Sequence, residues 1–500
     1  MSHRLSMACL AAAAALALAA CADMKGIDPQ AKLTDAAALG LQEQPATPGG
    51  QGQLTPAADW WTALGDAQLN RLVAQALQGS PGLRAAAARV AKAQSAIGIA
   101  RADDLPQVGG QLDAQRMRFQ ENYIYPPPYG GSQFNFGTLQ LNGSWELDFF
   151  GKHSGALAAA VGQARAAEAE RDAARVLLAA NVVRAYVQWA RVEDQRAVAE
   201  LTLVQRQQML QLVHERLRAG LDTQLEVREN ETGRADSRTQ ITALAQQADA
   251  ARNALAALLG QPRLPADVTA PRLAAFKALA LPTELYADWL GRRADIVAAR
   301  WRVEAARGGV EVAKSEFYPN INLVGAIGLQ SLGFNHWLKS GSLEWNAGPA
   351  IRLPIFEGGR LRANLRGQTA DLDAAIEDYN ATVINAMRDA ADQAQAVQSL
   401  AIQREQQGQA LAAAEGAYAI AGNRYRAGLT AYLNVLVTET TVLGQRRQQV
   451  DLLAQSLNAQ IGLAQAMGGG WQPTADETAP PLAVAEGAAS AAPPAAAAAP

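Results

Sequence analysis

Residues 216–260 have the sequence RLRAGLDTQLEVRENETGRADSRTQITALAQQADAARNALAALLG, and residues 424–468 have the sequence RYRAGLTAYLNVLVTETTVLGQRRQQVDLLAQSLNAQIGLAQAMG. The two stretches align without a gap at a constant offset of 208 positions. A period of this length exceeds the roughly 20–50 residues of a solenoid repeat. We therefore predict a duplicated, domain-sized half and a fold with internal pseudo-symmetry. The identical pairs include Arg216/Arg424, Arg218/Arg426, Gly220/Gly428, Leu225/Leu433, Glu231/Glu439, Arg238/Arg446 and Gly260/Gly468.

The amino-terminal residues match the pattern of a bacterial lipoprotein signal. Arg4 precedes an apolar run at residues 7–20, which is shorter than the roughly 18–20 residues of a membrane-spanning helix. The run ends in LAAC at residues 18–21, which resembles a lipobox, so cleavage would leave Cys21 as the lipid-bearing terminus. The alternative is an ordinary secretory signal with a chance cysteine. Because Ala22 rather than aspartate follows the cysteine, the outer membrane is favoured over the inner one.

Composition excludes several classes of function. The only other cysteine, Cys9, lies within the signal, so the mature chain has no disulfide and no thiol chemistry. The formal charge of −3 and the lack of a basic tract give no reason to expect a nucleic-acid partner. The histidines are scattered, and no phosphate-binding loop is present. We therefore expect no catalytic residue, no metal site and no cofactor, and we predict that the protein is not an enzyme.

Two short segments in each half alternate apolar and polar residues with period two, which predicts strands at about residues 107–118, 137–149, 320–331 and 343–355. Each is long enough for a tilted strand that crosses a membrane. Its apolar face would meet lipid and its polar face a water-filled lumen, although a soluble antiparallel sheet with one wet face shows the same pattern. The candidate lumen residues are Glu146, Asp148, Glu344 and Arg352.

Four strands in hydrocarbon raise a problem of closure. An open sheet leaves two edges with unpaired backbone groups, which a membrane does not tolerate. The smallest bacterial barrels have about eight strands. If the segments are membrane strands, the chain must therefore oligomerise to complete its barrel.

The longest segments predict helices. Residues 155–219 contain no proline and only one interior glycine, Gly162, and residues 360–427 repeat this composition. About 65 helical residues span roughly 100 Å, with a bend or break expected within the stretch. Return helices are predicted at residues 223–259 and 431–467. The turns between them, at about 218–223 and 426–431, have arginine in the last helical turn and glycine just after it, which is typical of a helix stop.

These elements predict a mainly α-helical fold with a membrane β part, in two repeats. The expected organisation is a signal peptide at residues 1–20, an N-terminal linker at 21–55, a first repeat at 56–265, a linker at 266–284, a second repeat at 285–470 and an Ala/Pro-rich disordered tail at 471–500.

A series of short motifs runs in order from residue 60 to residue 428. They are WW at 60–61, LNRLV at 69–73, LRAA at 83–86, ARV at 88–90, WELDFFGK at 145–152, LLG at 258–260, RRADI at 292–296, FYP at 317–319, PIFEGG at 354–359 and RYRAG at 424–428. In this order they resemble the outer-membrane factors of the TolC superfamily, in the lipoprotein (NodT/OprM-like) branch that serves resistance-nodulation-division efflux pumps.

The resemblance implies a homotrimer in which duplicated helical hairpins form an α-barrel and four strands per chain complete a twelve-stranded outer-membrane β-barrel. It implies a passive exit duct for drugs or other small molecules, lipid-anchored on the periplasmic side of the outer membrane of a Gram-negative bacterium. The implied partners are a periplasmic adaptor, an inner-membrane resistance-nodulation-division pump and outer-membrane lipid. Two alternatives remain open: a type I secretion duct for proteins or peptides, and a periplasmic structural lipoprotein without a channel.

The resemblance also assigns candidate sites by position. The hairpin tips that would contact the adaptor are Arg216, Arg218, Gly220, Leu221, Arg424, Arg426, Gly428 and Leu429. Family members often carry a leucine and, four residues later, an aspartate as constriction rings near the tip. Leu433 matches the leucine, whereas Val437 stands in the place of the aspartate, with Glu439 two residues beyond. The periplasmic gate candidates are therefore Glu229, Leu433, Val437 and Glu439.

Overall fold

The computed structural model describes residues 24–34, 57–279 and 291–472. The predicted signal peptide, Cys21, most of the first predicted linker, the end of the second one and nearly all of the tail lie outside these ranges. The chain forms two compact units. Of the described residues, unit 1 holds those up to Leu33 together with Arg89–Ala167 and Ala299–Tyr379, and unit 2 holds the others.

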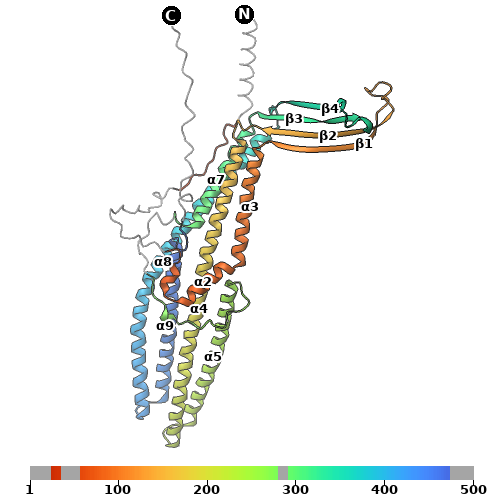
Figure 1. The fold of residues 1–500 in the computed structure, drawn as a ribbon. Helices are drawn as coiled ribbons and strands as arrows, with labels where there is room; N and C mark the ends of the chain where they lie inside the picture. The colour runs from red at the N-terminus through yellow and green to blue at the C-terminus, as the bar shows by residue number, and fades with distance from the viewer. Residues whose placement is uncertain (1–23, 35–56, 280–290, 473–500) are drawn as a thin grey trace, which may run out of the picture. The chain divides into compact units, whose positions relative to one another are not determined.

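Unit 1 contains one antiparallel sheet of four strands in the order β1-β2-β3-β4 (Figure 1). The strands are β1 (Gln107–Arg118), β2 (Gln133–Glu146), β3 (Asn320–Leu332) and β4 (Leu343–Arg352). β2 begins earlier than the predicted residue 137 because its first residues pair with the end of β1, with Gln133 opposite Arg118. β4 ends before the predicted residue 355 because Pro354 has no N–H to donate to a ladder.

Two long helical hairpins dominate the remainder of the chain (Figure 1). α4 (Lys152–Arg218) and α8 (Arg360–Arg426) have 67 residues each, and α5 (Gln224–Leu258) and α9 (Tyr432–Ala466) have 35 each. Every boundary of α8 and α9 lies 208 positions after the matching boundary of α4 and α5, so the duplication is confirmed. The expected break within the long helices is absent, since α4 and α8 are each continuous.

The shorter elements complete the order. They are α2 (Ala67–Gly79), α3 (Pro81–Asp103) and α7 (Ala294–Ser315), with 3-10 turns η2 (Trp60–Leu64), η3 (Leu273–Ala275), η4 (Phe334–His336) and η5 (Ser340–Ser342). The predicted fold class, mainly α-helical with a β part, is confirmed. In the part of the chain that the structure describes, none of the helices combines the length and apolar character needed to cross a membrane.

The largest core lies in unit 2, where the WW motif has a structural role. Trp60 and Trp61 are buried against the apolar face of α2 and the middle of α4. Asp66 caps α2 by accepting the N–H of Leu69 at 2.9 Å, and it also accepts the hydroxyl of the buried Tyr186 at 3.0 Å. This region fixes the start of the first repeat to the centre of α4.

In unit 1, α4 and α7 approach so closely that only small residues fit between them. A Cβ added to Gly308 would lie 2.6 Å from the backbone nitrogen of Ala159, and one added to Gly162 would lie 2.8 Å from that of Ala305. Backbone atoms cannot move aside as a flexible side chain can. These glycines are therefore required by packing, although glycine is a poor helix former.

We predict that Gly308→Ala destabilises the protein by about 1–3 kcal/mol, because the overpacking outweighs the helix propensity of alanine. The measurement is the thermal unfolding midpoint of the purified protein. Gly367→Ala in α8 is the matched control, since a Cβ there meets no atom within 4 Å. An unfolding midpoint that rises equally in both variants would show that the two helices do not need the glycine contact.

Candidate functional site: the tips of the helical hairpins

Both hairpins turn through the same backbone motif, and both tips belong to unit 2. Gly220 and Gly428 have φ angles of 71° and 74°, in the left-handed region that favours glycine. The N–H of Leu221 reaches the carbonyl of Arg216 at 2.9 Å, and the N–H of Leu429 reaches that of Arg424 at 2.8 Å. This is the Schellman arrangement that satisfies the last carbonyls of a helix. The predicted helix stop is confirmed in both copies.

The arginines of the two tips have different surroundings. Arg216 pairs with Asp222 at 3.0 Å, and their side chains are only 11% and 6% exposed. The same guanidinium donates to the carbonyl oxygen of Tyr425 at 2.9 Å and lies 4.5 Å from the centre of its ring. The hydroxyl of Tyr425 in turn donates to Asp222. Arg216 therefore ties the tip of the first hairpin to the end of α8.

The pKa shifts of Arg216 and Tyr425 favour these contacts between the first hairpin tip and the end of α8. The hydrogen bond to Asp222 raises the pKa of Arg216. Burial, and then the hydrogen bond to Asp222, raises the pKa of Tyr425, so its hydroxyl keeps the proton that it donates. Arg218, Arg424 and Arg426, by contrast, have exposed side chains. Of the four tip arginines, these three therefore have side chains that another protein can reach.

The return helices begin differently in the two copies. At the start of α5 the hydroxyl of Thr223 accepts the N–H of Leu225 at 3.1 Å, and Glu226 accepts the N–H of Thr223 at 2.8 Å. The hydrogen bond from Thr223 lowers the pKa of Glu226, so this capping box persists at neutral pH and is lost only as the pH falls through the lowered pKa. At the start of α9, Ala431 provides no side-chain cap.

The first residue of α9 is held by the other hairpin instead. The amide of Asn230 donates to the hydroxyl of Tyr432 at 2.8 Å, and both residues are buried. The rings of Tyr432 and Tyr425 lie 5.5 Å apart. α5 thus begins with a local cap, whereas α9 begins with contacts to α5 and α8.

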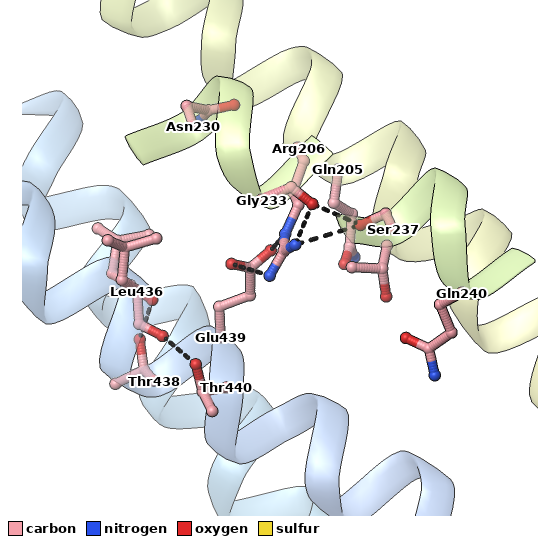
Figure 2. A network of polar contacts seen from close by, with 12 residues as sticks. Gln205, Arg206, Asn230, Gly233, Ser237, Gln240, Leu436, Thr438, Glu439 and Thr440 are labelled. Carbon is pink, nitrogen blue, oxygen red and sulfur yellow. Dashed lines mark hydrogen bonds and ion pairs between the residues drawn. The ribbon is translucent and has the colours of Figure 1, made fainter. Parts of the chain in front are cut away.

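About two helical turns further from the tip, a buried ion pair joins α4 to α9 (Figure 2). Arg206 contacts Glu439 at 2.9 Å and 3.2 Å, and it also donates to the carbonyl of Gly233 and, at 3.2 Å, to the hydroxyl of Ser237 on α5. The two side chains are 18% and 8% exposed. Glu439, a gate candidate, is therefore already neutralised within its own chain.

Two of the other three gate candidates lie on open surface. Leu433 and Val437 are 65% and 58% exposed and, four residues apart, share one face of α9. Glu229 is half-buried on α5. Nothing in one chain covers the face of Leu433 and Val437 among the described residues, so the assignment of a constriction to this face stays a prediction.

The candidate lumen residues divide into two groups in unit 1. Glu344 and Arg352 are exposed on β4. Glu146 pairs with Lys152 at 2.8 Å, and Asp148 accepts the N–H of Ser154 at 2.9 Å in the first turn of α4. Glu146 and Asp148 therefore stabilise the passage from β2 into α4. The assignment of all four residues to a lumen stays a prediction.

The sequence did not identify the residues that join the two hairpins near their tips. They are Asp222, Tyr425, Arg206 and Asn230. Tyr425 lies within the RYRAG motif, but its partner Asp222 is separated from it by 203 positions. No spacing rule connects such residues, and only the packing of the two hairpins against each other brings them together.

Comparison with known proteins decides the family. The family described as "Outer membrane efflux protein" matches residues 72–261 and 285–469, one segment in each half of the duplication. The chain belongs to this family. Members of the outer membrane efflux protein family are channels of tripartite efflux pumps in the outer membrane of Gram-negative bacteria, and they are not enzymes. Such channels work as homotrimers with an adaptor and an inner-membrane pump.

Relatives and solved structures agree with this assignment. The efflux protein is 39% identical over 366 residues to the fusaric acid resistance protein FusA of Burkholderia cepacia, covering 72% of this chain and 68% of FusA. It is 31% identical over 431 residues to the pyoverdine export outer membrane protein OpmQ of Pseudomonas aeruginosa, covering 85% and 90%.

The outer membrane protein VceC from Vibrio cholerae matches with a TM-score of 0.78 at 36% identity, covering 83% of this chain and 100% of VceC. The outer-membrane channel OprN matches with a TM-score of 0.80 at 28% identity, covering 89% and 100%. The resemblance to the TolC superfamily and the TolC-like fold are confirmed.

We predict that Glu439→Gln lowers the stability of the efflux protein by about 3 kcal/mol, because it leaves the guanidinium of Arg206 without its counter-charge in a buried site. A thermal or denaturant unfolding experiment measures this change. Glu231→Gln is the matched control: Glu231 is the duplicate of Glu439, but its pair with Arg228 is exposed, so its loss costs about 1 kcal/mol or less. Equal losses in the two variants would contradict the assigned role of the buried pair.

Proposed function

We propose that the protein is the exit duct of a tripartite efflux pump and passively conducts drugs or other small molecules to the cell exterior. The proposal rests on the combination of two features in one chain. The four-stranded sheet has unpaired outer edges on β1 and β4, and the two helical hairpins have equal lengths. Names of relatives support the substrate class, since they specify fusaric acid resistance, pyoverdine export and multidrug resistance. The two alternatives, a type I secretion duct and a structural lipoprotein, are not favoured.

The open strand edges support a homotrimer. β1 and β4 each have one neighbour in the sheet, so three copies joined β4 to β1 would close a barrel of twelve strands without a free edge. In this assembly Glu344 and Arg352 would contribute exposed charges to the lumen. The duplicated hairpins of three chains would then form the helical tube.

The exposed tip residues support contact with a periplasmic adaptor. Leu221 and Leu429 are large apolar side chains on open surface, beside the exposed Arg218 and Arg426. Apolar anchors with arginine neighbours are typical of protein interfaces. We assign these residues to contact with a periplasmic adaptor, which would connect the duct to an inner-membrane resistance-nodulation-division pump. Acylated Cys21 would anchor the trimer on the periplasmic side of the outer membrane.

The central experiment expresses the protein in a strain that lacks outer-membrane factors but contains a resistance-nodulation-division pump and its adaptor. We predict that the protein raises resistance to pump substrates, with fusaric acid as the first compound. The strain with pump and adaptor alone is the control. Susceptibility that stays unchanged for every compound would contradict the efflux role. Purified protein in planar bilayers should give discrete conductance steps, which a structural lipoprotein would not.

A second prediction separates adaptor contact from folding at the tips. Arg218→Ala and Arg426→Ala should weaken adaptor binding and leave the unfolding midpoint unchanged, because both side chains are exposed. Arg216→Ala should instead destabilise the protein by about 3 kcal/mol, because it leaves the buried Asp222 without its partner. Binding to immobilised adaptor and thermal unfolding are the two measurements. Wild-type adaptor binding and export in both exposed-arginine variants would refute the contact.

A further inference from the structure

The apolar face of the sheet in unit 1 becomes basic toward one end. Residues that lie opposite each other on neighbouring strands point to the same face, and every second residue along a strand shares that face. One row across this face is leucine on all four strands: Leu112, Leu139, Leu329 and Leu343. Arg116 and Arg118 follow Leu112 on β1 at four and six positions, so both are on the face of the leucines. Both arginines are exposed.

The arginines lie near the end of the sheet that is opposite the helices (Figure 1). β1 follows α3 and β2 leads into α4, so these helices adjoin one end of the sheet, and the loops 119–132 and 333–342 adjoin the other. In the proposed exit duct the helices extend into the periplasm. The loops, and the arginines beside them, then face the cell exterior.

Trp337 covers the face of the sheet between the leucine row and the arginines. A Cβ added to Gly137 would lie 2.7 Å from its indole ring, so the ring packs directly on the backbone there. Gly137 lies opposite Ala114, which is on the same face two residues before Arg116. The indole N–H donates to the carbonyl of Leu329 at 3.3 Å. Tryptophan is enriched where a barrel leaves the hydrocarbon, so Trp337 fits the outer boundary of the lipid-facing band.

The length of the strands gives the same level. β2 runs for eight residues from Trp145 to Gly137, which is about 27 Å along the strand and about 20 Å across a membrane at a tilt of about 40°. The lipid-facing band of such barrels is about 25 Å tall. Arg116 lies one row beyond Gly137, about 5 Å further out in the proposed barrel, so its guanidinium is at the level of the lipid head groups.

This end of the sheet is positively charged. Residues 114–136 and 331–343 contain three lysine or arginine side chains, Arg116, Arg118 and Lys339, against the single carboxylate of Glu121. Glu121 lies 4.0 Å from Arg118, and because their side chains are 74% and 65% exposed the pair is weak. Arg118 also donates to the carbonyl of Gly131 at 3.1 Å. The side chain of Arg116 has no hydrogen bond or ion pair with any residue in the described ranges.

A second copy of the chain does not supply the missing counter-charge. Asp113, the nearest carboxylate along β1, is on the opposite face, where it accepts the amide of Gln111 at 2.6 Å. In a barrel closed β4 to β1, the loop 333–342 of the neighbouring copy would lie next to the end of β1, and it contains no aspartate or glutamate. The anion that pairs with Arg116 must therefore come from the surroundings of the protein.

We propose that Arg116 and Arg118 bind a phosphate group of a phosphorylated glycolipid in the outer leaflet of the outer membrane. The two residues are about 7 Å apart along one face of β1, so both guanidinium groups can contact one phosphate. Arginine binds phosphate through two parallel hydrogen bonds, which an ammonium group cannot copy. Arg116 is the principal ligand because its side chain is unpaired, and Trp337 packs beside it at the border between acyl chains and sugar. The site rests on the proposed function.

The test measures binding of diphosphoryl lipid A to the full-length trimer in phosphatidylcholine nanodiscs. We expect Arg116→Gln to weaken binding about tenfold, Arg118→Gln severalfold and the double variant more than tenfold, because charge-assisted hydrogen bonds are lost. Arg116→Lys should weaken it severalfold, since it keeps the charge but not the two-point contact. Arg352→Gln is the matched control: it removes an exposed arginine from the opposite face of the same sheet, and it should bind as the wild type does.

Lipid A without phosphates and phosphatidylglycerol are the comparison ligands, and both should bind at least tenfold more weakly than diphosphoryl lipid A. Binding of diphosphoryl lipid A that is unchanged in the double variant, or lost equally in Arg352→Gln, would overturn the site. Equal binding of phosphatidylglycerol would show a general attraction of anionic lipid and would overturn the assignment to the glycolipid. Should the double variant fail to form trimers, Arg116→Lys measured against Arg352→Gln decides the question in the same way.

Conductance of the wild-type protein in planar bilayers separates this site from the proposed function. Wild-type protein that conducts but binds diphosphoryl lipid A no better than the form without phosphates would refute the site alone. Wild-type protein that gives no conductance would refute the exit duct, and the glycolipid site with it.

Discussion

The outer edges of β1 and β4 carry backbone N–H and C=O groups that have no partner within the four-stranded sheet. In hydrocarbon each unsatisfied group costs several kcal/mol, which is more than any side-chain contact in the sheet can return. The edges of one copy can be satisfied only by those of another. Oligomeric assembly is therefore the condition under which this sheet can enter a membrane, and the contacts between the hairpins operate within that condition.

The duplication preserves the backbone and changes the side chains. Both tips end in a left-handed glycine and the same pair of backbone hydrogen bonds. The residues around them have diverged: Arg216 is a buried clamp and its duplicate Arg424 is exposed, while Glu439 is buried and its duplicate Glu231 is exposed. The two hairpins thus have the same helix lengths and turns, and the residues that differ between them form the contacts that join one hairpin to the other.

Sequence periodicity was sufficient to predict the architecture. Long proline-free stretches and period-two segments depend on local chemistry, so helices and strands were recognised close to their observed positions. Ends were less predictable, because they depend on partners: the start of β2 follows the length of β1, and the passage into α4 depends on Asp148. The tip contacts were unpredictable from one copy, since identical arginines such as Arg216 and Arg424 acquire opposite environments only after the hairpins pack.

The equal lengths of the hairpins also constrain how such a chain can change. One residue inserted into α4 would move its tip by about 1.5 Å and rotate every later side chain by about 100°. The buried contacts between the hairpins, from Arg216 to Tyr425 and from Arg206 to Glu439, would then lose their register. Insertions and deletions in α4 are tolerable only with a matching change in α8, so the lengths of the two copies should vary together, whereas single substitutions on their exposed faces need no such match.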